Sequence, residues 1–520
     1  MSTIHRSPLG DVVIPDVSVT AHVFGEAARY PDRVAMVDGP TGRSYTYSTL
    51  EGAVFLAAGG FRARGIGRGD VVAVMAPNLP EYAIAFHGVA SAGGIVTSVN
   101  PTYGVEETHH QLADAGAQLL VTVPMFLGTA REAAVGTDVR EILVLGDVPE
   151  DAGPGVAPFA EVLAGAPLAP VAVDPDDVVA LPYSSGTTGL PKGVMLTHRN
   201  LVANLVQVER HLVMDDHEVM MAVLPFFHIY GMQIIMNDGL SRGATLVTMP
   251  RFDLVQYLSL IQEHRATRLF VVPPMVLALA RQPIVDDYDL SSVRTLFSGA
   301  APLGAELAEE AHRRIGARAM QGYGMTEMSP VSHACRFDDD RPGSIGILAA
   351  STEARVVDPA TGEDLGVGED GEIWVRGPQV MPGYLNNPEA TASTIDPEGW
   401  LHTGDIGHVD AEGYWYVVDR LKELIKVKGF QVAPAELEAL LLTHPAVADC
   451  AVVGIPDEEA GEIPKAFVAL MPGAECSAAA IQEFVAGHVA HYKQVRVVEF
   501  VDAIPKSPSG KILRRMLRDA

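Results

Sequence analysis

The fold is decided by the stretch Ser184-Ser185-Gly186-Thr187-Thr188-Gly189-Leu190-Pro191-Lys192-Gly193. A short apolar run at 178–181 precedes it and predicts a buried strand. Residues 194–196 are apolar again, and the polar residues at 197–200 favour the start of a helix. Three glycines let backbone N–H groups converge on an anion, and four hydroxyls and a lysine add further donors. The stretch therefore predicts a phosphate-binding loop between a strand and a helix.

This loop differs from the Walker P-loop. That motif needs a serine or threonine directly after its lysine to hold Mg²⁺, whereas here Gly193 follows Lys192. A second interpretation is a surface linker, since Ser, Thr and Gly are common in linkers. The apolar run before the loop and the fixed offset of the lysine favour phosphate binding.

Taken whole, residues 183–200 resemble the signature loop of the adenylate-forming superfamily. That superfamily contains acyl-CoA synthetases, the adenylation domains of peptide synthetases and beetle luciferases. The resemblance implies a loop that binds ATP phosphates, with Thr188 also a ligand of Mg²⁺. The residues implied in phosphate binding are Ser184, Ser185, Gly186, Thr187, Thr188, Gly189 and Lys192.

Length and composition predict a globular protein with two or more domains. The chain has 520 residues, 48% of them hydrophobic and 20% charged. The most apolar stretch, 82–99, is interrupted by a histidine, glycines and serines, so we expect no membrane span. The N-terminus lacks the apolar core of a signal peptide, and the last residues do not form a peroxisomal address.

Three widely separated cysteines, Cys335, Cys450 and Cys476, suggest neither a disulfide framework nor a zinc site. We therefore expect a cytoplasmic protein, either a monomer or a homodimer. The net charge of −28 argues against general nucleic-acid binding. The clearest positive cluster lies at 506–518, and on charge alone it indicates a solvated basic helix end.

Apolar strands alternate with helical stretches from about residue 34 to residue 297, which predicts α/β layers with largely parallel sheets. The strands that we expect span 71–75, 94–99, 119–123, 142–145, 219–224, 245–249, 269–272 and 295–297. Residues 81–92 have helical spacing. Residues 146–177 are rich in Ala, Pro, Gly and Asp and indicate a loose connection.

The pattern of the sequence changes after residue 343. Shorter strands at 354–357, 372–375 and 414–418 predict an antiparallel, β-barrel-like subdomain. After residue 420 a tail of about a hundred residues begins, with helices near 434–444 and 481–485 and strands at 450–453, 466–470 and 495–501. The prediction is therefore a large α/β domain at 1–420 and a small, mobile α+β domain at 421–520.

A second constellation, Gln321-Gly322-Tyr323-Gly324-Met325-Thr326-Glu327, combines a ring on which a flat ligand can lie with a carboxylate that suits Mg²⁺. Alone it is more typical of a turn with a buried tyrosine and a solvated glutamate. Together with 298–302 it resembles the adenine-binding segments of the superfamily, with Tyr323 stacking on adenine and Glu327 binding magnesium. The nucleotide-binding residues so implied are Gly299, Ala300, Ala301, Gln321, Gly322, Tyr323, Gly324 and Thr326.

Trp400-Leu401-His402-Thr403-Gly404-Asp405 and the following Asp419-Arg420-Leu421-Lys422-Glu423 form a third constellation. By resemblance, Asp405 binds both ribose hydroxyls, a suitable task for an acceptor-only carboxylate. Arg420 matches an arginine near ribose and phosphate. Lys422 matches the hinge between the two domains.

Two basic loops complete the pattern, 426–431 (Lys-Val-Lys-Gly-Phe-Gln) and 508–511 (Pro-Ser-Gly-Lys). The resemblance assigns Lys511 to adenylation, where a fixed ammonium neutralises the charge that builds up on phosphorus. Lys426 and Gln431 match residues that face the site in a second conformation, used for thioester formation. Lys428 and Gly429 match the CoA-binding loop, in which glycine lets the pantetheine arm approach the backbone.

His228 is either a satisfied core histidine or, by resemblance, a residue that orients the substrate carboxylate. The sequence 419–438 (DRLKELIKVKGFQVAPAELE) is most similar to that of 4-coumarate–CoA ligases. That resemblance implies an acyl pocket lined by Tyr230, Gln233, Phe270, Phe297, Gly324, Pro330 and Val331. Met328-Ser329 and Phe297 depart from those ligases, which usually have Ala-Gly and often lysine there.

The sequence thus predicts an AMP-forming ligase that uses ATP, Mg²⁺ and CoA and acts on a small carboxylic acid, with a cinnamate-like acid expected first. A medium-chain fatty acyl-CoA synthetase and a stand-alone enzyme that loads a carrier protein are the main alternatives. A luciferase-like oxygenase and a regulatory nucleotide-binding protein are further ones. Lys192, Glu327, Asp405 and Lys511 argue against the regulatory protein.

Overall fold

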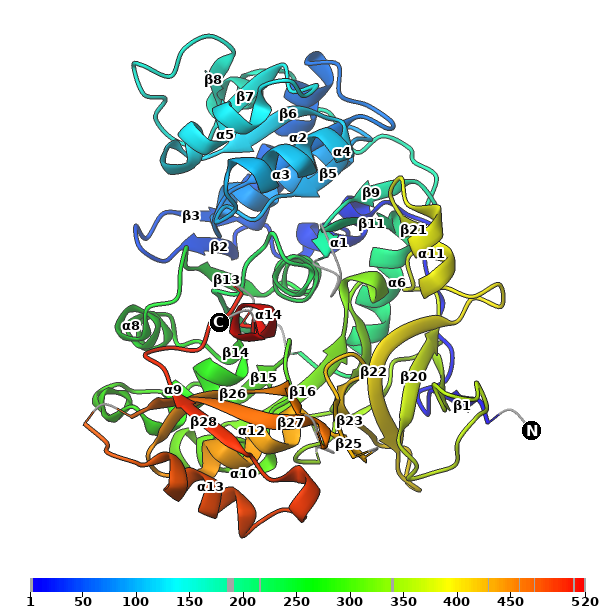
Figure 1. The fold of residues 1–520 in the computed structure, drawn as a ribbon. Coiled ribbons are helices and arrows are strands. Elements are labelled where there is room, and N and C mark those ends of the chain that lie inside the picture. Colours follow the sequence, from blue (N-terminus) through cyan, green and yellow to red (C-terminus); the bar gives the residue numbers. More distant parts are fainter. Residues whose placement is uncertain are drawn as a thin grey trace.

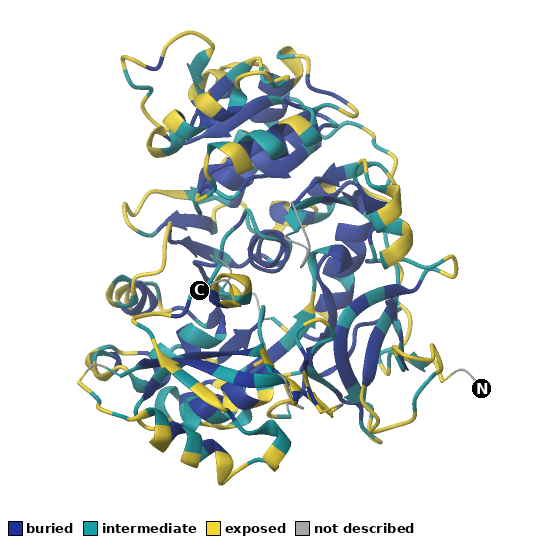
Figure 2. Ribbon diagram, viewed as in Figure 1, coloured by how far each residue is buried: buried dark blue, intermediate teal, exposed yellow. Residues whose placement is uncertain are grey.

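The computed structural model describes residues 3–184, 191–214, 217–337, 341–428, 430–457, 459–471, 473–507 and 510–518. The described strands form four sheets, three in the first 420 residues and one in the remainder (Figure 1). The strands are largely buried, whereas exposed positions gather on outer helix faces and loops (Figure 2). Among the described helices, none has both the length and the apolar character needed to cross a bilayer.

The first sheet has nine strands, and the two strands that flank the predicted phosphate-binding loop lie toward one end of it. Its order is β10 (Tyr183–Ser184), β11 (Lys192–Thr197), β9 (Val178–Ala180), β5 (Ile95–Ser98), β4 (Val71–Met75), β6 (Ala117–Thr122), β7 (Glu141–Val144) and β8 (Val156–Pro158), with β21 (Gly383–Tyr384) beside β11. The strands from β9 to β8 are parallel, and β10, β11 and β21 are antiparallel. Its helices are α2 (Tyr47–Ala63), α3 (Pro80–Ser91), α4 (Val105–Ala115) and α5 (Leu127–Ala134).

The second sheet, also of nine strands, holds the predicted adenine segments. Its order is β18 (Ile347–Leu348), β17 (Val331–Ala334), β16 (Arg318–Gly324), β15 (Thr295–Ser298), β14 (Arg268–Val271), β12 (Val219–Ala222), β13 (Thr245–Thr248), β2 (Val34–Asp38) and β3 (Ser44–Thr46). Pairing from β16 to β2 is parallel, as predicted. Its helical segments are α1 (Val19–Val23), α6 (His198–Glu209), the π-helix η4 (Tyr230–Asn237), α7 (Asp238–Ser241), α8 (Leu254–His264), α9 (Pro273–Arg281) and α10 (Ala305–Ile315).

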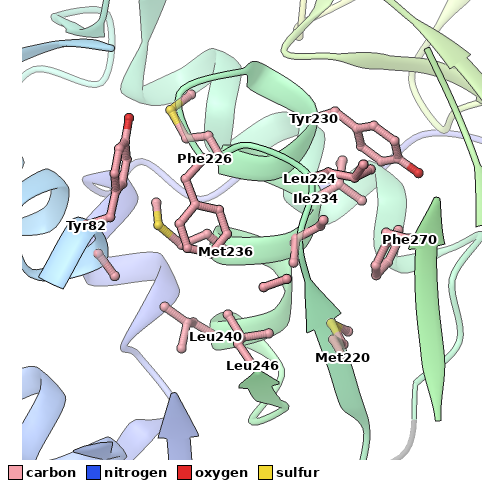
Figure 3. Close-up of a cluster of buried hydrophobic side chains, with 14 of the residues drawn as sticks. Tyr82, Met220, Leu224, Phe226, Tyr230, Ile234, Met236, Leu240, Leu246 and Phe270 are labelled. Atoms are coloured by element: carbon pink, nitrogen blue, oxygen red, sulfur yellow. The ribbon is translucent and has the colours of Figure 1, made fainter. Parts of the chain in front are cut away.

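The core between these two sheets is continuous. Apolar residues that enter it from η4 lie on two sides of that helix (Figure 3). Met236 packs toward Tyr82 and Phe226, whereas Tyr230 points toward Phe270. One helix therefore anchors the second sheet to α3 and also presents an aromatic ring to β14.

The predicted β-rich region is a five-stranded antiparallel sheet. Its order is β1 (His5–Arg6), β19 (Glu353–Val357), β20 (Gly371–Arg376), β22 (Leu401–Val409) and β23 (Trp415–Arg420), with α11 (Pro388–Thr394) nearby. A barrel-like form was expected here. Over the described residues the strands form an open sheet, with β1 and β23 at its two edges. β1 comes from the N-terminal segment and pairs with β19.

The fourth sheet belongs to the tail. It contains β25 (Phe430–Val432), β24 (Ile425–Val427), β27 (Gly461–Leu470), β26 (Val447–Asp457) and β28 (Val497–Phe500), with α12 (Pro434–Thr443), α13 (Ala478–Ala486) and α14 (Arg514–Arg518). The 3₁₀ turn η7 (His491–Lys493) also lies in the tail, whereas the 3₁₀ turns η5 (Pro283–Asp287) and η6 (Thr326–Met328) lie in connections of the large part. The tail has a hydrophobic core of its own, built around residues such as Ile425, Leu437 and Val468.

The connection predicted as loose at 146–177 is partly ordered. It contains β8 and the 3₁₀ helix η3 (Phe159–Ala164), which packs on α2. A Cβ atom added at Gly59 or Gly60 of α2 would lie under 2 Å from a backbone carbonyl oxygen of this connection. The composition of 146–177 indicated a loop. The two adjacent glycines of α2, however, leave room for this segment to pack against that helix.

Candidate active site

The predicted nucleotide residues gather where β15 and β16 end. Residues 299–301 follow β15, and 321–324 form the last part of β16. The carboxyl ends of parallel strands are the usual place for a ligand crevice. Gln321 is fixed there because its Oε1 accepts a hydrogen bond from the Leu303 N–H at 3.1 Å. Thr326 begins η6, directly before Glu327.

Tyr323, Asp405 and Arg420 form one linked group. The Tyr323 hydroxyl donates to Asp405 Oδ2 at 2.6 Å, and Arg420 Nε lies 3.3 Å from Asp405 Oδ1. The pairing of β22 with β23 sets Asp405 directly opposite Arg420. Burial raises the pKa of the Asp405 carboxyl above its ordinary value, while Arg420, Tyr323 and Lys511 act to lower it. A carboxylate held between cations and a hydroxyl is suited to accept hydrogen bonds from a ribose diol.

Glu327 lies at the junction of the first and second sheets. Its Oε1 accepts hydrogen bonds from Ser184 Oγ at 3.0 Å and from the Tyr384 hydroxyl at 2.8 Å. The Tyr384 ring in turn covers Lys192, whose Nζ lies 4.7 Å from the ring centroid. Register explains the contact, because Tyr384 of β21 pairs with Val194 of β11.

The oxygen donors around Glu327 fit a magnesium ion. A buried carboxylate and nearby hydroxyls are hard oxygen ligands of the kind that Mg²⁺ prefers, together with water and substrate phosphates. Thr188, the other predicted ligand, lies outside the described residues. So do Ser185, Gly186, Thr187 and Gly189, whereas Ser184 and Lys192 flank that gap on paired strands.

Lys511 comes from the tail into this group. The loop that carries it is closed by a bridge between Lys506 and Ile512 and by hydrogen bonds between Ser507 and Lys511. Burial and the Arg420 charge lower the pKa of the Lys511 ammonium, while Glu327 and Asp405 act to raise it. The tail lysine is thus within electrostatic range of the carboxylates of the predicted ribose and magnesium sites.

His228 lies in the loop before η4. Its Nδ1 accepts the backbone N–H of Tyr230 at 3.3 Å, so the proton of the neutral ring sits on Nε2. Burial, helped by the Lys511 charge, lowers the pKa of His228 to about 3. At neutral pH the ring is therefore a hydrogen-bond donor through Nε2.

The residues predicted for the acyl pocket centre on three aromatic rings. The Tyr230 hydroxyl donates to the Phe297 carbonyl at 2.9 Å, and the Phe270 ring lies 6.2 Å from that of Tyr230 and 5.9 Å from that of Phe297. Two glycines make room for these rings, because an added Cβ would lie 2.8 Å from Tyr230 at Gly299 and 2.9 Å from Phe297 at Gly322.

The remaining pocket residues are held by backbone contacts. Gln233 is fully buried, donates to the Leu201 carbonyl at 2.7 Å and accepts from Asn237 at 2.9 Å. Gly324 pairs with Val331, and an added Cβ would lie 2.0 Å from the Pro330 carbonyl oxygen. Glycine is therefore needed at 324 for the strand pairing itself.

Lys426, Lys428 and Gln431 are not brought to this group. They are exposed, and Lys426 and Gln431 face each other on the paired strands β24 and β25. Gly429 lies outside the described residues. Among the predicted tail residues that the structure describes, Lys511 is the one whose pKa is affected by Glu327 and Asp405.

Lys422 lies in the turn between β23 and β24. The Leu421 N–H donates to the Gly404 carbonyl at 2.8 Å, and the Glu423 N–H donates to the Arg420 carbonyl at 2.9 Å. Glu423 also pairs with Arg518 of α14. The turn is thus tied to the large part on one side and to the tail on the other.

Sequence reasoning missed Tyr384. It lies in Pro382-Gly383-Tyr384-Leu385, which resembles an ordinary turn in the sequence. Only the pairing of β21 with β11 brings its hydroxyl to Glu327 and its ring to Lys192. A Gly-Tyr pair two residues after a buried methionine was the only local signal.

Comparisons with known proteins agree with this geometry. The family model described as AMP-binding enzyme matches residues 23–385, and that of the AMP-binding enzyme C-terminal domain matches residues 436–511. The 4-coumarate–CoA ligase 2 of Petroselinum crispum is 45% identical over 99% of this chain and 96% of its own length. The 4-coumarate–CoA ligase 3 of Oryza sativa subsp. japonica is 46% identical over 99% of this chain and 94% of its own.

Solved structures are similar over nearly the whole chain. ATP-bound MatB from Rhodopseudomonas palustris has a TM-score of 0.88 and 30% identity, covering 97% of this chain and 99% of that one. The anthranilate CoA ligase AuaEII in complex with anthranoyl-AMP has a TM-score of 0.90 and 28% identity, covering 97% of each chain.

Proposed function

Since this chain belongs to the family of AMP-binding enzymes and is an AMP-forming acid–CoA ligase, we propose that it activates a cinnamate-like acid in two half-reactions, using the residues described above. The observation that carries this proposal is that the Lys511 ammonium, which comes from the tail, feels the charges of Glu327, Asp405 and Arg420 of the large domain. A mobile lysine at a nucleotide site is suited to a reaction that needs it for one step and not for the next.

In the first half-reaction a carboxylate oxygen of the acid attacks the α-phosphorus of ATP. The new carboxylate oxygen–phosphorus bond makes an acyl-adenylate, a mixed anhydride, and the bond from the α-phosphorus to the leaving pyrophosphate breaks. Tyr323 supports adenine, Asp405 accepts the ribose hydroxyls, and Lys192 and Lys511 neutralise phosphate charge. Glu327, with Thr188, would hold Mg²⁺, which when bound screens the phosphate charges.

His228 fits the role of orienting the acid. Its Nε2–H can donate to one carboxylate oxygen and leave the other free to attack, because Nδ1 is occupied by the Tyr230 N–H. Its lowered pKa keeps the ring neutral, so it acts through hydrogen bonding.

In the second half-reaction the thiol of CoA loses its proton and attacks the acyl carbon, and AMP leaves. We propose that the tail, residues 421–520, rotates about Lys422 against the large domain, 1–420. The rotation withdraws Lys511 and turns Lys426 and Gln431 to the site, with Lys428 and Gly429 beside CoA. The exposure of Lys426 on β24 and of Gln431 on β25 supports this, because both side chains can form a new contact surface.

A cinnamate-like acid is proposed because the relatives named above are 4-coumarate–CoA ligases and because Tyr230, Phe270 and Phe297 provide flat apolar surfaces. Phe297 cannot pair with a ring hydroxyl, and the Gln233 amide already bonds Leu201 and Asn237. An unpaired buried hydroxyl costs about 1–3 kcal/mol. We therefore expect cinnamate to be preferred over dihydroxylated caffeate.

The test compares kcat/KM for cinnamate, 4-coumarate, caffeate and octanoate in the wild type and in Phe297→Lys. We expect cinnamate to lead, and Phe297→Lys to shift preference toward hydroxylated acids. Octanoate in the lead would support the second candidate, a medium-chain fatty acid, which the same apolar rings accommodate. Caffeate as the best substrate of the wild type would overturn the proposed pocket.

The acceptor is tested with acid and ATP, with and without CoA. AMP formation that depends on CoA agrees with the ligase, whereas AMP formed only with a carrier protein would indicate the loading enzyme. We also propose that the protein works in a reducing cytoplasm, supported by the wide separation of its three cysteines in the sequence. A monomer or a homodimer is expected, and sedimentation would distinguish the two.

A further inference from the structure

Arg281, the last residue of α9, joins three helices. Its Nε lies 3.1 and 3.2 Å from the two carboxylate oxygens of Glu310 in α10, and its Nη2 lies 3.0 Å from Oε2. Its Nη1 donates to the carbonyl of Leu442 in α12 at 3.1 Å. Glu310 belongs to the large domain and Leu442 to the tail, so one guanidinium connects the two.

Leu442 offers a carbonyl that the helix itself leaves free. It is among the last four residues of α12, whose carbonyls lack a helical N–H partner. The neighbouring carbonyls of Leu440 and Leu441 accept from the Thr443 hydroxyl and the His444 N–H. A cation at a helix C-terminus is also electrostatically favourable. Glu310 fixes the planar guanidinium, which leaves Nη1 aimed at α12.

The opposite end of α9 also contacts the tail. Val272, directly before α9, lies against the loop of Lys511, since a Cβ added at Gly510 would be 3.1 Å from a Val272 methyl. One helix of the large domain therefore touches the Lys511 loop at its start and α12 at its end. Figure 1 shows α12 and β26 lying over α9 and α10.

We propose that Arg281, held by Glu310, is a positioning residue that stabilises the orientation of the tail in which Lys511 lies at the nucleotide site. The inference rests on the proposed two-step function and deepens it. Rotation of the tail must break the bond between Arg281 and Leu442 but leaves the pair of Arg281 and Glu310 intact. Arg281 thus favours the adenylation orientation without touching substrate.

The chain offers a direct measure of this orientation. A Cβ added at Gly304, before α10, would lie 3.9 Å from the Cβ of Ala439 in α12, close to the ~3.8 Å of a disulfide. Gly304 has a φ of −64°, which any residue adopts. The pair Gly304→Cys and Ala439→Cys, in a Cys476→Ser background, should cross-link only while α12 is docked on α10.

The experiment compares the rate of this cross-linking with Arg281 intact and with Arg281→Ala. We expect the substitution to slow cross-linking about three- to tenfold, the scale of one charge-assisted hydrogen bond between partly exposed groups. In the protein without added cysteines, Arg281→Ala should slow acid-dependent pyrophosphate release by a similar factor. Thioester formation from a supplied acyl-adenylate and CoA should be unchanged or faster.

Arg314→Ala is the matched control. Arg314 lies on α10 with a similar side-chain exposure, 20% against 22%, but donates to the Ala280 carbonyl and pairs with Asp286, both in the large domain. It should leave both half-reactions in their wild-type ratio. Glu310→Gln weakens the ion pair that fixes the Arg281 guanidinium but keeps Arg281. It should have the same effects as Arg281→Ala, and it replaces that variant if Arg281→Ala folds poorly.

Equal cross-linking rates with and without Arg281, or the same slowing by Arg314→Ala, would overturn the inference. A uniform loss in both half-reactions would do so as well, because it indicates a merely structural role. Cross-linking needs no substrate. A protein that cross-links as expected but activates no acid would therefore refute the proposed function and leave the role of Arg281 standing.

Discussion

Among the basic residues at 506–518, Lys511 is distinguished by its surroundings. Lys506 pairs with Asp449, Arg514 with Glu438 and Arg518 with Glu423, all within the tail. Lys511 instead lies near carboxylates of the large domain. Charge alone indicated a solvated helix end. The partners of these four cations distinguish Lys506, Arg514 and Arg518, which pair within the tail, from Lys511.

Lys511→Ala should slow acid-dependent pyrophosphate release by roughly 10²–10³, the scale for removing one preorganised donor in an active site. Supplied with acyl-adenylate and CoA, the variant should still form thioester, because Lys511 acts in the first step. An equal loss in both assays would contradict this division.

The pH dependence follows from the lowered pKa of Lys511. The ammonium is needed for adenylation, so the rate should fall as pH rises through this pKa, earlier than for a free lysine at about 10.4. The measurement is kcat/KM for adenylation between pH 7.5 and 10.5, which reports the free enzyme. Lys511→Arg should move the alkaline limb upward, since guanidinium stays charged. An unmoved limb would assign it to another group.

Tyr384→Phe tests how Glu327 is held. The change removes the hydroxyl that donates to Glu327 Oε1 but keeps the ring over Lys192. We expect half-maximal adenylation to need a several-fold higher Mg²⁺ concentration. We also expect Mg²⁺ to raise the thermal unfolding temperature of the ATP-bound variant less than that of the ATP-bound wild type. Tyr416→Phe, on β23, serves as a control that leaves Glu327 untouched. An unchanged Mg²⁺ requirement would show that Ser184 alone suffices.

The sequence predicted some residues of the site and missed others. Asp405, Tyr323, Glu327 and Lys511 were predicted from motifs, and the structure brings them together. Tyr384 and Arg281 were not, because their partners are set by strand pairing and helix docking between distant parts of the chain. No local pattern encodes such contacts.

At the scale of elements, the turn at 421–423 separates the tail, which has a main core of its own, from the first 420 residues. A small apolar cluster of Ile406, Leu424 and Ala433 spans the turn. Lys422→Pro restricts φ to about −65° and should hold the tail in one orientation. We expect near-normal adenylate formation with poor thioester formation, measured as two separate half-reactions. Glu423→Pro would show whether any proline in the turn has this effect. Two intact half-reactions in Lys422→Pro would place the hinge elsewhere.

Elements with strong periodicity were predicted closely. The strand expected at 71–75 is β4, and the helix expected at 81–92 is α3, shifted by one residue. Thr197 caps α6 through a reciprocal bond with Asn200, as the polar start suggested. β1, η3 and the π-helical turns of η4 were missed, since each owes its form to tertiary packing rather than to its own composition.

At the scale of the molecule, buried neutral histidines link stability to pH. Burial lowers the pKa of His87 and His333 to about 3 and that of His198 and His211 to about 4. Between these values and about 6.5, the unfolded chain binds protons that the folded one does not. Stability should therefore be full above about pH 6.5 and fall as pH decreases below it.

Urea midpoints between pH 7.5 and 5.0 measure this effect. His87, between the rings of Phe24 and Phe86, should contribute about 1.4 kcal/mol per pH unit below 6.5. His87→Gln should flatten the slope by that amount whatever its effect on absolute stability. The exposed His488→Gln should leave the slope unchanged. A slope in His87→Gln identical to that of the wild type would refute the assignment.

The pairing of β1 with β19 has a consequence for the order of events on the ribosome. His5 lies opposite Ala354, so the first strand is made about 350 residues before its partner. At usual rates of translation that interval is roughly 20–70 s. During it, the leading residues have no edge to join, while β2 and the first sheet already can form around α2 and α3. β1 is thus synthesised long before β19 and is paired only late, and a bulky group attached directly before β1 would compete for that late docking.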